Sequence, residues 1–403
     1  MSSLKINNLN KVFPSGEAGL YNVSLEAEDK EFLVLAGGDD SGKSTLLRII
    51  AGLEDATGGE IYIDGKDVTS VEPKDRDLAM IFKSSTLYPS LNVFDNMAFG
   101  LRLRKAPEAL VRERVKVAAE VLGLTDVLTR KPKTLTAAAK QRVAIGRAMV
   151  REPKLYLFDD PLSGLDEKLR LDVLNVIINL QARMSGTFVY CTKNVAEAMT
   201  IGTRIAVIKN GFLQQVDTPA NLYDYPANTY VAFYIGSPTV NFVKKAVIGR
   251  TDGGYCAIFG GVSVKLSEKT VERFKNIDEY AGTDKPVILG IRPEDAKITV
   301  DGVIKGVISG VSEDGKYAEC NVTPDICLNV SVTDGAEKGK EVNISFDGDR
   351  LFVFDAKTCL TLLERDGGYV KTKYADADFV PLGYDEEEAI LEGLKPKKEK
   401  KKK

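Results

Sequence analysis

The sequence predicts an α/β protein with a mostly parallel sheet, followed by a small all-β barrel. Three observations lead to this class. Strand and helix patterns alternate from residue 1 to about 235, which favours a parallel sheet covered by helices. The continuous apolar run Phe32–Ala36 is typical of a strand buried on both faces. Beyond Gly236-Ser237-Pro238, short alternating runs such as Tyr317–Val322 and Leu328–Val332 are separated by Gly and Asp turns, as in a small barrel.

Directly after the apolar run, residues Gly37–Ser44 carry the phosphate-loop pattern G-x-x-x-x-G-K-S. The residues that follow, up to Ile50, have an apolar face and predict a helix, and these flanks disfavour a chance glycine-rich turn. A strand, a loop and a helix in this order direct backbone N–H groups and a helix N-terminus towards an anion. Lys43 would reach the outer phosphates of a nucleotide. We expect the nucleotide to contact Gly37, Gly38, Asp39, Asp40, Ser41, Gly42, Lys43, Ser44 and Thr45.

A second apolar strand, from Leu155 to Phe158, ends in Asp159. Such a carboxylate lies at the carboxyl edge of a parallel sheet, where ligands bind. There it can hold the Mg²⁺ of a nucleotide together with the hydroxyl of Ser44. We therefore expect Ser44 and Asp159 to be the metal ligands.

Composition narrows the class of protein. A chain of 403 residues is long enough for two or three domains of about 100–200 residues each. A net charge of −3 gives no indication of nucleic acid binding. Five scattered cysteines without a C-x-x-C pair indicate reduced thiols in a cytosolic protein, and no signal peptide or apolar run near 18 residues is present. The sequence contains no histidine, which removes the usual general base and pH switch.

The chain divides into three predicted parts. Residues 1–235 form the nucleotide-binding domain, with a helical subdomain inserted at about 89–150 that contains helices at Ala106–Leu122 and Gln141–Met149. Residues 236–366 form the barrel domain. Residues 367–403 are acidic and then Lys-rich, which predicts a disordered, solvated tail, with weak attraction to anionic lipid as the alternative.

Six segments within residues 1–366 carry the pattern of one family. They are Gly37–Arg48 (a Walker A loop), Leu87–Gly100 (the segment after a Q-loop), Gln141–Ala148 (the helix after a signature motif), Leu155–Asp166 (Walker B and D-loop), Gly236–Pro238 and Gly290–Asp295 (a regulatory barrel). Together they resemble the ATP-binding subunits of ABC importers, and most closely the maltose-transporter type that energises uptake of carbohydrates and glycerol phosphate.

The resemblance implies a P-loop core with an OB-like C-terminal barrel, ATP and Mg²⁺ as cofactors, and a peripheral location at the cytoplasmic face of the membrane. Two such subunits sandwich two nucleotides, each site joining the Walker motifs of one chain to the signature of the other, and Asp166 belongs to the D-loop. Transmembrane permease subunits would dock on Ala51–Leu53 and Leu87–Gly100. Phe13 lies where the family stacks an aromatic ring on adenine, with core packing as an equal alternative.

Most catalytic positions of that family are altered here. Lys83 stands at the Q-loop glutamine, Asp160 at the general-base glutamate and Lys193 at the switch histidine. The phosphate loop carries Asp39 and Asp40 where the terminal phosphate would lie. A carboxylate about 4 Å from a phosphate costs roughly 4 kcal/mol at an effective dielectric constant near 20. We expect ATP hydrolysis to be weak or absent.

The signature motif is altered as well. Its family form is L-S-G-G-Q, and here it is Leu135-Thr136-Ala137-Ala138-Ala139. Thr136 keeps a hydroxyl, whereas each of Ala137 and Ala138 adds a Cβ where backbone should approach the partner's nucleotide, and Ala139 lacks the side-chain amide. Both faces of the subunit would therefore weaken a composite site.

The altered positions also suggest a charge pattern. We hypothesise that Lys193 or Lys83 pairs with Asp40 or Asp39 and fills the space of the γ-phosphate, with independent drift as the alternative. Three functions follow: a non-hydrolysing partner of a competent ATPase, in a homodimer or a heterodimer; a slow transport ATPase; or a nucleotide-sensing scaffold.

Overall fold

The computed structural model describes residues 2–84, 86–332, 335–368 and 387. Contacts divide the chain into two compact units, one ending at Pro219 and one beginning at Ala220. This division falls before residue 235, because the helices α7 (Pro219–Asp224) and α8 (Thr229–Tyr234) group with the second unit. None of the described helices is long and apolar enough to cross a membrane. The predicted tail lies almost wholly outside the described residues.

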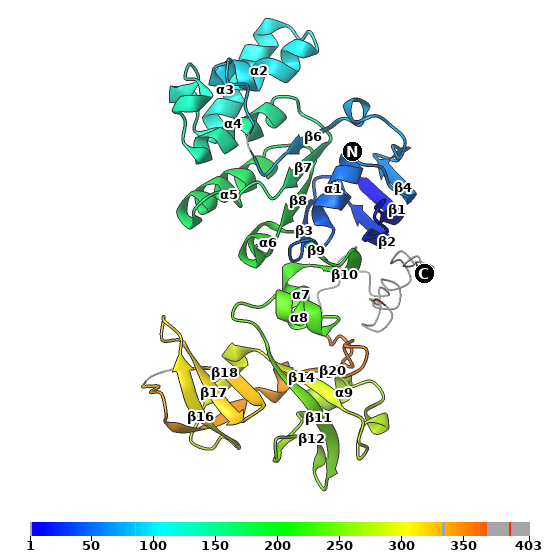
Figure 1. Cartoon of the computed structure of the whole chain (residues 1–403), viewed down its shortest axis with the longest axis vertical. Helices are drawn as coiled ribbons and strands as arrows, with labels where there is room; N and C mark the ends of the chain where they lie inside the picture. Colours follow the sequence, from blue (N-terminus) through cyan, green and yellow to red (C-terminus); the bar gives the residue numbers. More distant parts are fainter. Residues whose placement is uncertain (1, 85, 333–334, 369–386, 388–403) are drawn as a thin grey trace, which may run out of the picture. The chain divides into compact units, whose positions relative to one another are not determined.

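Two sheets build the first unit (Figure 1). The antiparallel sheet has the order β2-β1-β4-β5, with β1 Leu4–Val12, β2 Ala18–Ala27, β4 Gly58–Ile63 and β5 Lys66–Asp67. The second sheet has the order β10-β9-β3-β8-β7-β6. Its strands are β3 Phe32–Ala36, β6 Leu78–Ile81, β7 Leu155–Asp159, β8 Thr187–Thr192, β9 Arg204–Lys209 and β10 Phe212–Asp217.

The second sheet confirms the predicted parallel core. Strands β9, β3, β8, β7 and β6 are parallel, and only the edge strand β10 pairs antiparallel. Every residue of β3 and of β7 is buried, as the apolar runs predicted. The carboxyl ends of β3, β8, β7 and β6 therefore lie side by side, and the segments that follow them converge on one edge.

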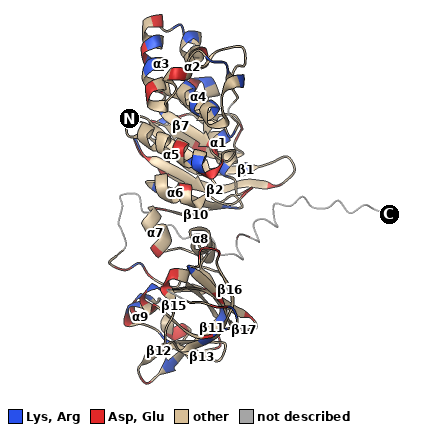
Figure 2. Ribbon diagram, turned by 90° about the vertical axis from the view of Figure 1, so that its left-hand side faces the viewer, with Lys and Arg blue, Asp and Glu red and all other residues tan. Residues whose placement is uncertain are grey.

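Helices flank this sheet, with α1 (Lys43–Ala51) on one side and α5 (Glu167–Gln181) and α6 (Val195–Ile201) on the other (Figure 1). The predicted helical insertion between β6 and β7 is present as α2 (Val93–Leu103), α3 (Glu108–Leu122) and α4 (Ala137–Met149), with acidic and basic residues interspersed along its helices (Figure 2). Helix α4 begins four residues before the predicted Gln141, because the Thr136 hydroxyl caps it by accepting from Ala139 N. Short 3₁₀ turns lie at Pro73–Asp75, Thr125–Val127 and Pro132–Thr134.

The second unit contains the predicted closed barrel and a further sheet. The barrel order is β15-β18-β17-β16-β19, with β15 Ala296–Ile298, β16 Ile304–Val311, β17 Tyr317–Thr323, β18 Ile326–Ser331 and β19 Glu341–Phe346. The sheet order is β13-β12-β11-β14-β20, with β11 Asn241–Thr251, β12 Gly254–Phe259, β13 Val262–Lys265, β14 Val287–Ile291 and β20 Phe352–Asp355. Helix α9 (Glu268–Arg273) and 3₁₀ turns at Ile277–Glu279, Pro293–Asp295 and Gly348–Arg350 complete it.

Arg292 joins the two segments of this unit that carried the family resemblance. Its guanidinium is 1% exposed, donates to the carbonyls of Tyr223, Ala232 and Ile235, and lies 3.9 Å from the centre of the Tyr223 ring. A Cβ on Gly236 would lie 2.7 Å from this guanidinium, so glycine allows the close approach. Burial lowers the pKa of Arg292 to about 10, and it remains charged at neutral pH.

Candidate nucleotide site

The phosphate loop wraps around the ammonium of Lys43. Its Nζ donates to the carbonyls of Gly37 at 2.8 Å and Gly38 at 2.5 Å and to the hydroxyl of Ser41 at 2.8 Å. Burial lowers the pKa of Lys43, while the nearby Asp39 and Asp160 carboxylates oppose this shift. The side chain is held at the start of α1, where an anion bound by the loop would meet it.

The backbone conformation of the phosphate loop is compatible with aspartate at positions 39 and 40. Gly42 has φ 101°, and a Cβ there would lie 2.6 Å from the carbonyl oxygen of Gly19. Asp40 has φ 56°, in the left-handed region that Asp and Asn tolerate best among residues other than glycine. Asp39 and Asp40 are both exposed. The loop therefore keeps its shape while it places two carboxylates on its outer side.

The two predicted metal ligands are in contact. The Ser44 hydroxyl donates to Asp159 Oδ1 at 2.6 Å, and Asp159 is only 6% exposed. A hydroxyl and a carboxylate oxygen at one point are the hard oxygen donors that Mg²⁺ prefers, so these residues fit the ion. Arg48 Nη2 lies 3.9 Å from Asp159 Oδ2 and compensates part of its charge. Lys83, at the position of a family glutamine, offers an ammonium and no oxygen ligand.

The register of the sheet explains where the two unusual lysines lie. Ile81 of β6 pairs with Phe158 of β7, so two residues further along Lys83 comes opposite Asp160. Lys83 Nζ is 3.7 Å from Asp160 Oδ2. Burial raises the pKa of the Asp160 carboxyl, and the Ser163 hydroxyl and the Lys83 ammonium oppose that rise. The position predicted for the general base is thus a half-buried carboxylate beside a cation.

The second lysine reaches the phosphate loop. Ala36 of β3 pairs with Thr192 of β8, so Lys193 comes beside the first residue of the loop. Lys193 Nζ lies 3.1 Å from both carboxylate oxygens of Asp39. The hydrogen bond from Lys193 lowers the pKa of Asp39, and the charges of Lys43 and Lys83 act in the same direction. This is one of the ion pairs predicted from the sequence, whereas Lys83 pairs with Asp160 and not with a loop aspartate.

A buried network that was not among the predictions from the sequence holds the end of β8. Glu197 is 4% exposed and accepts from the hydroxyls of Tyr190 at 3.0 Å and Thr192 at 2.8 Å. Arg170 Nε lies 3.4 Å from Glu197 Oε1. Asn194 caps α6 by accepting from Glu197 N at 3.1 Å. The pattern N-x-x-E is a capping signal, and it was the one sign in the sequence that Glu197 is fixed next to Lys193.

The remaining predicted residues lie at element boundaries. Thr136 is the N-cap of α4, followed by exposed Ala137, buried Ala138 and half-buried Ala139. Asp166 is the N-cap of α5 and accepts from Leu169 N at 3.0 Å, so this D-loop carboxylate has a structural role that was not predicted. None of the contacts described above joins Thr136–Ala139 or Asp166 to the phosphate loop of the same chain. The role predicted for both segments, which is to contact the nucleotide of a partner subunit, remains a prediction.

Phe13 lies in the turn between β1 and β2. Its ring is half-buried, with Lys11 Nζ 5.4 Å from the ring centre, and a Cβ on Gly19 would lie 2.6 Å from the ring. Gly19 in turn lies against Gly42 of the phosphate loop. The ring of Phe13 therefore lies near the phosphate loop, and part of its surface is exposed to solvent. This position is compatible with both predicted roles of the ring, stacking on adenine and packing in the core.

Exposed apolar side chains lie within the predicted docking segments or next to them in the sequence. They are Leu53, Phe82, Tyr88, Phe99 and Leu103, which are between 37% and 74% exposed. The rings of Tyr88 and Phe99 lie 4.5 Å apart. We call these five residues the docking surface, after the role that the sequence predicts for these segments.

One buried side chain fixes the loop of this surface. Asn96 is fully buried, accepts from Tyr88 N at 2.8 Å and donates to the carbonyls of Tyr88, Leu91 and Asn92. Because its amide satisfies both a donor and several acceptors of the 88–92 loop, the exposed ring of Tyr88 is held in place.

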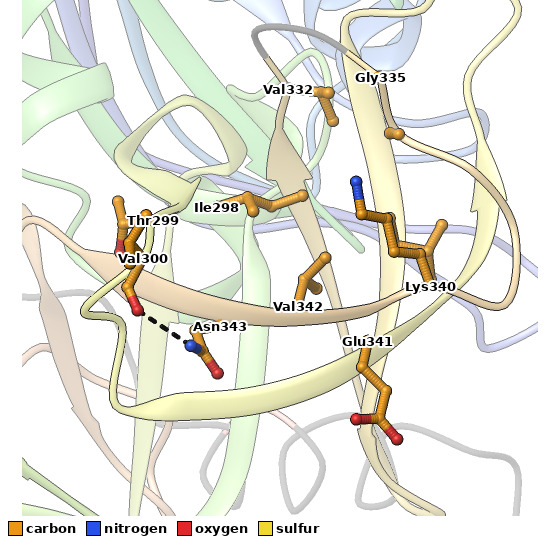
Figure 3. A pocket seen from close by; sticks show the side chains of 11 residues that line it. Ile298, Thr299, Val300, Val332, Gly335, Lys340, Glu341, Val342 and Asn343 are labelled. Atoms are coloured by element: carbon orange, nitrogen blue, oxygen red, sulfur yellow. Dashed lines mark hydrogen bonds between the residues drawn. The ribbon is translucent and has the colours of Figure 1, made fainter.

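The barrel contains a cavity of about 350 Å³ (Figure 3). Its lining mixes apolar side chains, among them Ile298, Val300 and Val342, with the polar residues Thr299, Lys340, Glu341 and Asn343. Lys340 extends towards Val332 and Gly335 while Glu341 points away, and Asn343 Nδ2 donates to the Val300 carbonyl at 3.0 Å. The described residues of this lining belong to no glycine-rich loop that precedes a helix, so they do not offer a phosphate the backbone contacts that Gly37–Ser44 offers.

Comparisons with known proteins agree with this architecture. A family model described as ABC transporter matches residues 20–163, and one described as MalK OB fold domain matches residues 236–296. The oligosaccharides import ATP-binding protein MsmX of Bacillus subtilis is 40% identical over 369 residues, covering 89% of this chain and 99% of the relative. The trehalose/maltose import ATP-binding protein MalK of Thermococcus litoralis is 40% identical over 375 residues, with the same coverage of 89% and 99%. The structure of cbiO1 from Clostridium perfringens, part of the ABC transporter complex cbiONQ, matches with a TM-score of 0.52 and 25% identity, covering 54% of this chain and 89% of cbiO1.

Proposed function

Because the chain belongs to the ATP-binding subunits of carbohydrate-uptake ABC importers, we propose that it binds nucleotide and docks on permease subunits but hydrolyses ATP slowly or not at all. It then serves as a structural or regulatory partner of a competent ATPase at the cytoplasmic face of the membrane. The observation that carries the proposal is that both lysines at altered catalytic positions are paired with carboxylates, Lys83 with Asp160 at 3.7 Å and Lys193 with Asp39 at 3.1 Å.

The pairing of Lys83 with Asp160 weakens general-base catalysis. A cation beside a carboxylate stabilises its charged form and reduces its basicity. Asp160 is also one methylene shorter than the glutamate that the family uses, so its oxygen reaches less far towards an attacking water. A well-placed general base contributes about 10²–10⁴-fold to rate, and this contribution depends on hydrogen-bond reach.

The two lysines also change how water is oriented. An ammonium has three donors and no acceptor, so Lys83 and Lys193 cannot accept a proton from the attacking water. Lys193 in addition has Asp39 as a partner at the phosphate loop. Mg²⁺ held by Ser44 and Asp159 would neutralise charge on the outer phosphates of a bound nucleotide. Binding of nucleotide is therefore supported better than its hydrolysis.

The signature face supports the same proposal. In a dimer of such subunits, Thr136 and Ala137–Ala139 would face the nucleotide bound by the partner. The exposed methyl group of Ala137 hinders the close backbone approach that a glycine permits, whereas the methyl group of Ala138 is buried within the chain. Paired with an intact relative, the chain would weaken both composite sites, and in a homodimer the defects would coincide.

One observation favours a slow transport ATPase as the second candidate. Burial raises the pKa of Asp160, and a carboxylate with a raised pKa is a stronger base at neutral pH. Under this reading Asp160 accepts the proton of water inefficiently, and Lys193 leaves Asp39 to contact the γ-phosphate.

Steady-state ATPase activity distinguishes these candidates. We propose to measure the purified chain alone, with its membrane subunits, and in both assemblies as the Asp160→Asn variant, with Asp126→Asn, an exposed aspartate of the helical subdomain, as the matched control. No turnover in any assembly supports the non-hydrolysing partner. Turnover that Asp160→Asn abolishes and Asp126→Asn leaves intact supports the slow ATPase. Failure to co-purify with membrane subunits favours the nucleotide-sensing scaffold.

A further inference from the structure

The carboxylate of Asp39 lies among the cations of the nucleotide site. Lys193 Nζ is 3.1 Å from both of its oxygens, and the charges of Lys43 and Lys83 also act on it. Lys43 holds the loop in which Asp39 stands, through the Gly37 and Gly38 carbonyls. These cations come from three different segments that converge at the carboxyl edge of the sheet.

A terminal phosphate would require the same surroundings. It is an anion with several acceptor oxygens, and the phosphate-loop lysine is the group that reaches the outer phosphates. The Asp39 carboxylate, with two oxygens on one ammonium, already supplies an anion there. A triphosphate would have to separate Asp39 from Lys193 and accept a carboxylate next to its γ-phosphate, whereas a diphosphate would leave this pair in place.

We propose that Asp39 acts as a built-in substitute for the γ-phosphate and makes the site selective for nucleoside diphosphate over nucleoside triphosphate. The inference rests on the proposed function only in that it requires Gly37–Ser44 to bind a nucleotide. It makes Asp39 a specificity-determining residue of this chain's own phosphate loop.

The neighbouring Asp40 is the natural comparison. It stands on the same exposed stretch of loop, in the left-handed conformation, and among the described residues no lysine or arginine nitrogen lies within 4.0 Å of its carboxylate. Both aspartates add the same charge, but only Asp39 is held against an ammonium by short contacts. An effect of general loop charge would make the two equivalent, whereas a substitute for the phosphate would make Asp39 dominant.

Nucleotide titration by calorimetry tests the proposal. The full chain is titrated with ADP and with an ATP analogue whose β–γ bridge cannot be hydrolysed, both with Mg²⁺, for the wild type, Asp39→Asn, Asp39→Ser, Asp40→Asn and Asp126→Asn. We expect the wild type to bind ADP about tenfold tighter than the analogue. Asp39→Asn, which keeps the shape and removes the charge, should bring the ratio of the two dissociation constants close to one. Asp40→Asn should change it less, and Asp126→Asn should leave it at the wild-type value.

The outcomes separate this inference from the proposed function. If the wild type binds both nucleotides equally and Asp39→Asn leaves the ratio unchanged, the inference is overturned while the nucleotide site stands. If Asp40→Asn changes the ratio as much as Asp39→Asn does, loop charge in general is responsible and the substitute role is overturned. If neither nucleotide binds, both the site and the inference are wrong. Asp39→Ser gives the same readout should Asp39→Asn fold poorly.

Discussion

The edge of the parallel sheet and the docking surface differ in how far their side chains depart from the pattern of the family. At the sheet edge, backbone geometry and metal-ligand pair fit a nucleotide site, yet the side chains that would face the terminal phosphate are charged groups paired with one another. At the docking surface, exposed aromatic rings rest on a loop held by a fully buried asparagine. The comparison predicts that this chain keeps the framework for binding nucleotide and permease while ATP hydrolysis is impaired.

The largest effect should come from removing the two loop carboxylates and restoring the family side chains at the Q-loop, general-base, switch and signature positions. The variant combines Asp39→Ser, Asp40→Gly, Lys83→Gln, Asp160→Glu, Lys193→His, Ala137→Gly, Ala138→Gly and Ala139→Gln. In the assembled transporter we expect its ATP turnover to exceed that of the wild type by about 100-fold or more, the range that a general base alone contributes.

Two outcomes bear on this prediction. Lys116→Gln, a substitution of an exposed lysine on α3, is the control for loss of a lysine and should not raise turnover. If the restored variant binds ATP and docks on the permease but remains inactive, the altered residues are not what limits hydrolysis, and the contrast between the two regions is wrong.

Removal of an exposed ring from the docking surface should weaken binding to the membrane subunits and leave the fold of the chain intact. Phe99→Ala removes a ring that is 37% exposed and lies 4.5 Å from the Tyr88 ring at a tilt of 38°. We expect affinity for the membrane subunits to fall about tenfold, as for a residue that contributes to an interface hot spot. Asn96→Ala removes the buried amide instead and should lower the free energy of unfolding by about 2–3 kcal/mol, because loop donors and acceptors lose their partner.

Co-purification with the membrane subunits in detergent measures the loss of binding. Denaturation in urea measures the free energy of unfolding. Nucleotide affinity is the control, since neither residue lies in the phosphate loop. Wild-type permease binding by Phe99→Ala would show that this surface is not the docking site.

The pH dependence of any residual turnover tests the role of Asp160. A base must be deprotonated, so turnover should fall as pH drops through the pKa of Asp160, which burial holds above its ordinary value. The Lys83 ammonium lowers that pKa, and its removal in Lys83→Gln should therefore move the acid limb of the profile to higher pH. An acid limb that does not move would show that another group titrates.

Local patterns predicted much of this molecule, and register explains much of what they did not predict. The phosphate loop and the buried strands β3 and β7 were evident because their patterns lie in contiguous residues. The barrel was evident from its short alternating strands, although its closure depends on pairs far apart in the sequence, such as β16 with β19. The pair of Lys83 with Asp160 was not, because it depends on β6 lying next to β7 in a register that sets Ile81 beside Phe158. The pair of Lys193 with Asp39 was one of several combinations that charge alone permitted.

The smallest expected effect is on stability at the Lys193 and Asp39 pair. Both side chains are largely exposed, at 50% and 76%, and exposed ion pairs contribute little to folding because solvent screens them and ordering two side chains costs entropy. Lys193→Gln should therefore leave the melting temperature without nucleotide at the wild-type value, while it weakens binding of the ATP analogue. Glu197→Gln, which alters the buried network beneath, should lower the melting temperature and serves as the contrast. A large loss of stability in Lys193→Gln would mean that the pair is a structural clamp of the loop, and the interpretation of Asp39 as a substitute for phosphate would lose its basis.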